Sequence, residues 1–351
     1  MRPADGVRAL GPLRLAHFHD RGNADIPIGA FGTIGCGSRP PSGLAYPLHM
    51  RARTPLTFTA VLLVAATAGC GVSEIDTAQP GYVQAGEAFW GEWRVPEGAV
   101  LLGTPFPEEF APQQEGLPED PESVTAEFLL VDDPYLAVRD LVAQIEAEGL
   151  RVVAEPDSRA CGVDHGFSCR LYGVGDDGLT KVAARFIGAA QPESGDPFPL
   201  LELEIGAWTS LYPSRDDWVD FEAPQGESGF DLPQTAADEL GPGTEVPLFG
   251  STTVLGQVPE GARLLAPLYN PSATYGVHAV FHIEEDTALA EIEAIADRVS
   301  SGERYPDADL TSGDLTSHRI AYNGDAGGCQ VELDTVETGD AAIALLHVAC
   351  D

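Results

Sequence analysis

The chain has 351 residues, of which 55 are Asp or Glu and 19 are Lys or Arg, so its formal net charge at pH 7 is −36. Proteins that bind nucleic acid neutralise phosphates with clustered Lys and Arg, whereas Lys181 is the single lysine of this sequence. The composition therefore argues against nucleic acid as a partner and is typical of a well-solvated acidic body.

Residues 1–49 differ from the rest of the chain in composition. They contain three acids, are rich in Gly, Pro, Arg and His, and show no sustained hydrophobic period. Met50 offers a later start of translation, so we expect this segment, with Cys36, to be an upstream mis-start that takes no part in the fold. A disordered segment is the alternative.

A signal peptide is predicted over residues 50–69. Arg51 and Arg53 form a short positive head, residues 56–68 are uncharged and mostly apolar, and small residues close the segment. This order is typical of a secretory signal peptide. The apolar run is shorter than the about 20 residues of a membrane-spanning helix. A buried core helix would explain neither the basic residues before the run nor the small residues after it.

The end of this segment, Thr67-Ala68-Gly69-Cys70, resembles the lipobox of bacterial lipoproteins. The resemblance implies that the thiol of Cys70 receives a diacylglyceryl group and that Cys70 is the first residue of the mature protein. It also implies a location on the extracytoplasmic face of the cell membrane, with the membrane as a partner through the lipid. The low lysine content beside many Ala, Gly, Val and Arg residues resembles proteins of high-GC actinobacteria.

Composition divides the remaining chain into two modules joined by a linker. A polar, acidic segment leads to Trp90 and Trp93, which are either an interfacial belt or the first core residues, and we favour the core. A second acidic segment, rich in Pro, Gly and Ser, is expected to be a linker or a strap that binds a partner. Trp218 and Phe221 indicate that part of it packs on a module. The predicted order is a tether over 70–92, a first module over 93–208, a linker over 209–250 and a second module over 251–351.

The two modules are related by an internal repeat. Val95–Ala99 returns as Val258–Ala262, and the order of elements behind it repeats as well. In each copy an extended stretch ending in acids, Ala126–Asp133 or Ala279–Glu285, precedes a helix whose apolar residues recur every three or four positions. The apolar stripes are Val138, Leu141, Val142 and Ile145 in the first copy and Leu289, Ile292, Ile295 and Val299 in the second.

A hairpin and a closing strand follow each helix. Gly175-Asp176 and Gly324-Asp325 supply turn residues between extended stretches, and the last strands are predicted over residues 200–207 and 343–350. We therefore predict the α+β class, with two tandem related modules, each a mainly antiparallel sheet with one helix packed on one face.

Four cysteines remain after Cys70, and an extracytoplasmic compartment permits disulfides. Four cysteines allow three pairings, among which sequence alone does not choose. The repeat favours pairing within each module, Cys161 with Cys169 and Cys329 with Cys350. Both cysteines of the second pair fall on the inward face of strands that could be neighbours, which is a geometric condition for a disulfide.

Alternation along the strands predicts which faces are buried. Leu201, Leu203 and Ile205 are expected to face the helix of the first module, and Glu202 and Glu204 to face water. In the second module the inward set is Val277, Ala279, Phe281 and Ile283 on one strand and Leu346, Val348 and Cys350 on another.

The opposite face of the second module carries three histidines and is the best candidate site. Its residues are His278, His282 and His347, with Val280 and Leu345. We expect no metal and no cofactor, because residues four apart in a strand lie about 13 Å apart and His278 and His282 could not share one ion. His347 could join only one of them. The face is a surface for a protein partner, a contact between the modules or a plain solvated face.

Acidic clusters elsewhere have structural explanations. Asp307–Asp314 has the oxygen ligands of a calcium loop but neither its full spacing nor its closing glutamate, so an acidic turn is expected. Asp132-Asp133 and Glu284-Glu285 stand just before the two helices and are predicted to cap them.

The sequence lacks the signatures of common enzyme classes. It has no G-x-S-x-G and no H-E-x-x-H pattern, although its many carboxylates leave a glycosidase-type pair open. We predict a lipid-anchored extracytoplasmic binding or interaction protein, with an envelope protein as candidate partner. The alternatives are a cell-surface hydrolase, which would need perturbed carboxylates across a deep inter-module cleft, and a structural envelope lipoprotein.

Overall fold

The computed structural model describes residues 75–108, 122–156, 161, 168–190, 197–208, 217–271, 274–299, 302–323 and 328–350. The predicted signal peptide, Cys70 and the segment before Met50 lie outside these ranges. All described residues belong to one compact unit. Within them, no helix combines the length and the apolar character needed to span a membrane.

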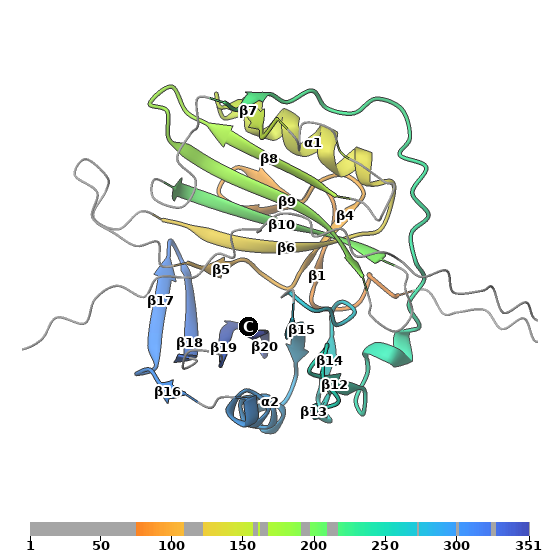
Figure 1. The fold of residues 1–351 in the computed structure, drawn as a ribbon, viewed down its shortest axis with the longest axis vertical. Coiled ribbons are helices and arrows are strands. Elements are labelled where there is room, and N and C mark those ends of the chain that lie inside the picture. The colour runs from red at the N-terminus through yellow and green to blue at the C-terminus, as the bar shows by residue number, and fades with distance from the viewer. Residues whose placement is uncertain are drawn as a thin grey trace, which may run out of the picture. The chain divides into compact units, whose positions relative to one another are not determined.

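The first module is a nine-stranded antiparallel sheet with one helix lying on one face (Figure 1). The strand order is β1-β4-β6-β10-β9-β8-β7-β11, β5 pairs with β6, and β2 and β3 form a separate small hairpin. The elements are β1 (Tyr82–Val83), β2 (Ala88–Trp90), β3 (Trp93–Arg94), β4 (Ala99–Leu102), β5 (Phe106–Pro107), β6 (Val124–Leu130), α1 (Pro134–Ala147), β7 (Arg151–Ala154), β8 (Cys169–Val174), β9 (Thr180–Ala190), β10 (Pro197–Trp208) and β11 (Val219–Asp220).

The second module is a seven-stranded antiparallel sheet, also with one helix on one face (Figure 1). Its order is β14-β15-β20-β19-β18-β16, β17 pairs with β18, and β12 and β13 form a two-stranded sheet. The elements are a 3-10 turn (Ala237–Leu240), β12 (Glu245–Pro247), β13 (Val254–Gln257), β14 (Ala262–Leu264), β15 (Tyr275–Ile283), α2 (Asp286–Val299), β16 (Glu303–Arg304), β17 (Ala308–Ser312), β18 (Leu315–Asn323), β19 (Cys329–Thr338) and β20 (Ala341–Cys350).

The two sheets share one topology. Strands β4, β6, β10, β9 and β8 follow one another in the first sheet as β14, β15, β20, β19 and β18 do in the second. The register also agrees, because Ala99 pairs with Leu130 and Ala262 pairs with Ile283. The predicted α+β class with two sheet-and-helix modules is confirmed.

The glycine of the repeat has the same task in both modules. Gly98 and Gly261 have φ angles of +75° and +78°, a region that disfavours residues with a Cβ atom. A Cβ on Gly98 would lie 3.2 Å from Cβ of Asp132, and one on Gly261 would lie 2.9 Å from Cβ of Glu285. The glycine carbonyls accept hydrogen bonds from the chain just before each helix. The repeated sequence therefore forms a turn before β4 or β14 that is hydrogen-bonded to the segment preceding α1 or α2.

Each helix buries its apolar stripe against its own sheet. Val138, Leu141, Val142 and Ile145 of α1 lie in the first core, and Ile292 and Ile295 of α2 lie in the second. Asp133 caps α1, because its carboxylate accepts a hydrogen bond of 2.8 Å from the backbone N–H of Tyr135. The predicted inward sets of the second module all lie in its core, among them Val277, Phe281, Leu346 and Val348.

Both predicted disulfides are formed. Cys161 bonds to Cys169, and Cys329 bonds to Cys350. The second pair joins neighbouring strands, since Cys329 lies opposite Cys350 in the register of β19 and β20. Both cysteines of each disulfide belong to the same module, as the repeat predicts.

The tether and the linker were predicted too wide. Tyr82–Val83 pairs with β4, and Trp93 lies in the first core, so the chain is already folded well before residue 92. Trp218 stacks on Tyr172 with 4.4 Å between ring centroids, and Val219–Asp220 pairs with β7. The expectation that Trp218 and Phe221 pack on a module is confirmed, since both are 8% exposed and lie in clusters of the first module. Glu245–Pro247 belongs to the second module as β12.

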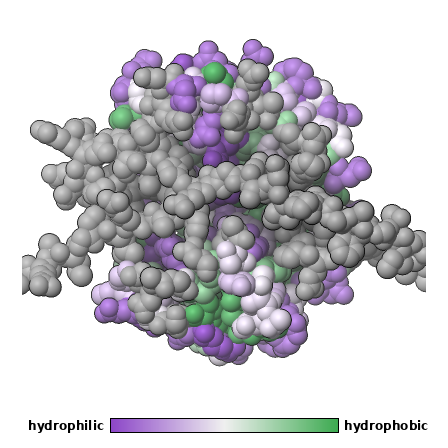
Figure 2. Space-filling view, in the orientation of Figure 1, coloured by the Kyte–Doolittle hydropathy of each residue, from purple (hydrophilic) through white to green (hydrophobic). Residues whose placement is uncertain are grey.

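The surface and the acidic loop fit the expected solvated body. Figure 2 shows many hydrophilic side chains in the upper and lower parts of this view, with a group of apolar side chains near its lower edge. The acidic segment Asp307–Asp314 forms β17 and the turn into β18, where Ser312 pairs with Leu315. This stretch is a hairpin, as the acidic-turn interpretation predicts.

Candidate functional site

The histidine face of the second module is covered by the sheet of the first. Val280 and Ile343 are 2% and 1% exposed and belong to an apolar cluster with Leu129 and Leu200 of the first module. Leu345 packs against the same cluster. Of the three interpretations of this face, the solvated one is wrong, because the side chains lie in a contact between the modules.

Three side chains from both modules form a polar chain inside this contact. Nε2 of His278 lies 2.7 Å from Oε1 of Glu127, and each side chain is only 7% exposed. Nδ1 of His278 lies 3.2 Å from Nδ1 of His347. Burial lowers the pKa of His278, but the carboxylate of Glu127 outweighs it, so that the pKa is raised. The negative charge of Glu127 thus favours the protonated form of His278.

His282 occupies a different part of the same face. It pairs with Ile343 in the sheet register, whereas His278 pairs with His347. Its side chain packs against the turn at Gly81, and its pKa is lowered by burial and by the nearby Arg263. The structure thus brings together two of the three predicted histidines. Within the described ranges, no group of three or more His, Cys, Asp or Glu side chains could hold a metal ion.

Of the two glutamates predicted to face water, Glu204 is buried, whereas the side chain of Glu202 is 31% exposed. Glu204 is 8% exposed and its Oε2 atom has no hydrogen-bond partner among the described residues, and Glu202 lies beside Glu127 in the register of β10 and β6. The pKa of both is raised, above all by burial. Nη1 of Arg185 lies 3.9 Å from Oε2 of Glu202. Alternation places these side chains correctly opposite the helix, but of the two only Glu202 keeps part of its side chain in water.

A second charged group lies further along the contact. Arg319 of β18 donates two hydrogen bonds of 2.7 Å to the carboxylate of Asp334, which is 2% exposed. Nη2 of Arg319 also lies 3.6 Å from Oε2 of Glu108 in the first module. Burial raises the pKa of Glu108 to about 7. Sequence analysis missed these residues, although charged side chains within the apolar strands β18 and β19 are a signal for such a pair.

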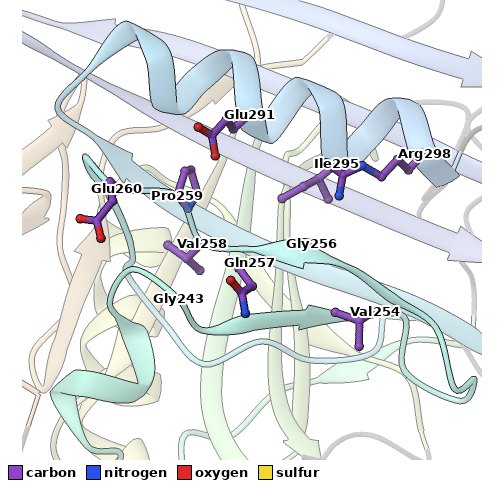
Figure 3. Close-up of a pocket in the computed structure, with 10 residues that line it drawn as sticks. All are labelled: Gly243, Val254, Gly256, Gln257, Val258, Pro259, Glu260, Glu291, Ile295 and Arg298. Carbon is purple, nitrogen blue, oxygen red and sulfur yellow. The ribbon is translucent and has the colours of Figure 1, made fainter.

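A pocket of about 490 Å³ opens elsewhere, between α2 and the β12–β13 hairpin (Figure 3). Val258 and Ile295 form a buried apolar part of its wall, and Val254 at its side is 50% exposed. Arg298 donates a hydrogen bond to the carbonyl of Leu255. Its lining residues are Gly243, Val254, Gly256, Gln257, Val258, Pro259, Glu260, Glu291, Ile295 and Arg298.

Comparisons with known proteins give no relative. No protein-family model, no curated protein and no solved structure matches the chain. The function therefore has to be argued from the chemistry of the contact and the pocket.

Proposed function

We propose that the chain is a lipoprotein, anchored to the extracytoplasmic face of the membrane through Cys70, that binds a ligand or an envelope partner. The lipobox resemblance of residues 67–70 supports the anchor, and the two disulfides fit an oxidising compartment. The acidic surface keeps the folded part away from anionic head groups while the lipid holds the chain at the membrane.

The observation that carries a binding role is the pocket beside α2. Its volume of about 490 Å³ lies in the range of small-molecule sites, about 300–1,000 Å³. Apolar walls at Val258 and Ile295 supply area for burial, and Glu260, Glu291 and Arg298 at the opening supply charges of both signs. By contrast, the acid–base groups Glu127 and His278 are closed off between the sheets.

A cell-surface hydrolase is the second candidate, and one observation favours it. Glu202 and Glu204 have raised pKa values because of burial, and they lie opposite the second module next to Glu127 and His278. Paired carboxylates with perturbed pKa values are typical of hydrolytic sites. A hydrolase would require the contact to open to its substrate.

The binding proposal is tested by in-cell crosslinking of the tagged full-length chain, followed by affinity purification and mass spectrometry of what is captured. Val254→Asp places a negative charge in the pocket. Val131→Asp is the control, because it places the same charge on the first module at a similarly exposed valine, with Val131 42% and Val254 50% exposed. We expect capture to be lost in Val254→Asp and kept in Val131→Asp. Equal capture by both variants would exclude the pocket. A wild-type chain that captures nothing would contradict an envelope protein partner and favour a small ligand or the hydrolase.

The anchor is tested separately by mass spectrometry of the native N-terminus and by fractionation. We expect the mature chain to begin at a diacylated Cys70 and Cys70→Ser to leave the membrane fraction. A peptide from residues 1–49 in the mature protein would contradict the predicted start and the cleavage.

A further inference from the structure

The contact between the two sheets holds more carboxylates than cations. In its first part, Arg319 is 12% exposed and faces Asp334 and Glu108, which are 2% and 15% exposed. One guanidinium thus serves two carboxylates, and Glu332 of β19 and Asp334 both raise the pKa of Glu108 further. One negative charge is in surplus whenever Glu108 is ionised.

In the second part of the contact, three carboxylates meet two arginines and one histidine, so the charges balance only while His278 is protonated. Glu127, Glu202 and Glu204 come from β6 and β10 of the first module. The cations that act on them are Arg185, which is 53% exposed on its side-chain atoms, Arg170 of β8 and His278. An exposed guanidinium is screened by water and compensates a buried carboxylate poorly.

Unpaired atoms mark the same place. Oε2 of Glu127 and Oε2 of Glu204 are buried without a hydrogen-bond partner in the part of the chain that the structure describes. Leaving an ionised oxygen buried and unpaired is costly, and a buried carboxyl group avoids that cost by taking up a proton. Tyr269, which is buried against His278, adds no positive charge.

We propose that the contact between the two sheets is a latch that proton uptake closes, and that it loosens as protons leave its buried carboxyl groups. When the carboxyl groups lose their protons, surplus negative charge remains between β6 and β10 of the first module and β15, β18 and β19 of the second. Deprotonation of His278 removes the positive partner of Glu127 in the same step. Opening would expose the face defined by His278, His282, His347, Val280 and Leu345.

The raised pKa values of the buried groups make the closed contact more stable at low pH than at high pH. Glu108, Glu202 and Glu204 have folded-state pKa values above their ordinary ones, so their contribution to the closed state is complete at low pH and is lost as pH rises through the folded pKa. His278 acts in the same direction, because its raised pKa makes the protonated, ion-paired form the stable one. For each proton released on opening, the closed state weakens about tenfold per pH unit between the ordinary pKa of the group and its raised folded pKa, and no further above the folded value.

The test measures the distance between the modules in the full chain with Cys36 replaced by Ser. Dyes are attached at Val131→Cys and Val254→Cys, which are exposed positions on the first and second module. The other cysteines are in disulfides or, at Cys70, expected to be lipidated. Energy transfer is recorded from pH 5.5 to pH 8.5. We expect energy transfer to be highest at pH 5.5 and to fall as pH rises towards about 7, the pKa of Glu108.

Two variants show whether the buried carboxyl groups cause the change. Glu108→Gln with Glu204→Gln mimics two of the protonated groups, so we expect energy transfer to fall less with rising pH than in the wild type, with Glu202 and His278 causing the fall that remains. Glu245→Gln, at an exposed position of β12, is expected to follow the wild type. Transfer that stays constant in the wild-type chain, or that falls equally in the double variant, would overturn the latch.

Discussion

Replacing Arg319 by Met should destabilise the folded chain strongly, because it removes the cation shared by two carboxylates. Asp334 is 2% exposed and loses both of its 2.7 Å hydrogen bonds, and Glu108 loses the guanidinium at 3.6 Å. Removing one partner of a buried ion pair lowers the free energy of unfolding by about 3–5 kcal/mol, because the charge of the other partner stays buried without compensation. For a chain of this size that corresponds to a fall in Tm of about 6–20 °C.

Urea unfolding of the full chain, followed by tryptophan fluorescence, measures this loss. The loss should be larger at pH 8 than at pH 5.5, because Asp334 and Glu108 can take up protons at the lower pH once Arg319 is gone. Arg151→Met is the matched control. Its ion pair with Asp220 lies at the surface, with side chains 61% and 77% exposed, and such pairs contribute about 0–1 kcal/mol.

A loss below about 1 kcal/mol in Arg319→Met, or a loss equal to that of Arg151→Met, would refute the reasoning. It would mean that water reaches the carboxylates of Asp334 and Glu108 and that the modules are not in contact there. A loss that does not depend on pH would contradict the protonation of these two groups while leaving the ion pair itself intact.

Three further changes test the fold. Gly261→Ala should lower the free energy of unfolding more than Gly86→Ala, because Gly86 has a similar positive φ but open space at its Cβ position. About 1 kcal/mol of backbone strain is common to both substitutions. Equal unfolding midpoints of the two variants would contradict the close contact at Gly261. Trp218→Ala should lose about 3 kcal/mol in urea unfolding, whereas a free linker would lose nothing. Cys329→Ser should lose about 2–4 kcal/mol, and a smaller loss in non-reducing conditions would show that this disulfide does not form.

Local patterns predicted the modules well because they report local causes. The three-and-four spacing in α1 and α2 reflects one buried face of a helix, and the repeated turn at Gly98 and Gly261 reflects one backbone geometry. The pairing of Cys329 with Cys350 followed from which residues share a face. These features depend on neighbours within one module, so one sequence suffices to find them.

The contact between the modules could not be predicted in the same way. Alternation placed Glu202 and Glu204 opposite the helix, but it cannot say what covers that face. The pair of Arg319 with Glu108 joins segments from different modules, and no periodicity links them. The histidine face was found as a site because three histidines on one side of a sheet are unusual. That its partner is the chain's own first module became visible only in the structure.

The central claim is that this face of the second module is closed by the first, and histidine modification by diethylpyrocarbonate tests it most directly. His282 is 5% exposed, so the reagent reaches its imidazole only if water enters the contact. His318, with a side chain 48% exposed, is the control within the same chain. We predict that His318 is modified while His278 and His282 stay protected until the chain is unfolded in urea. Modification of His282 as fast as His318 in the folded chain would contradict the account.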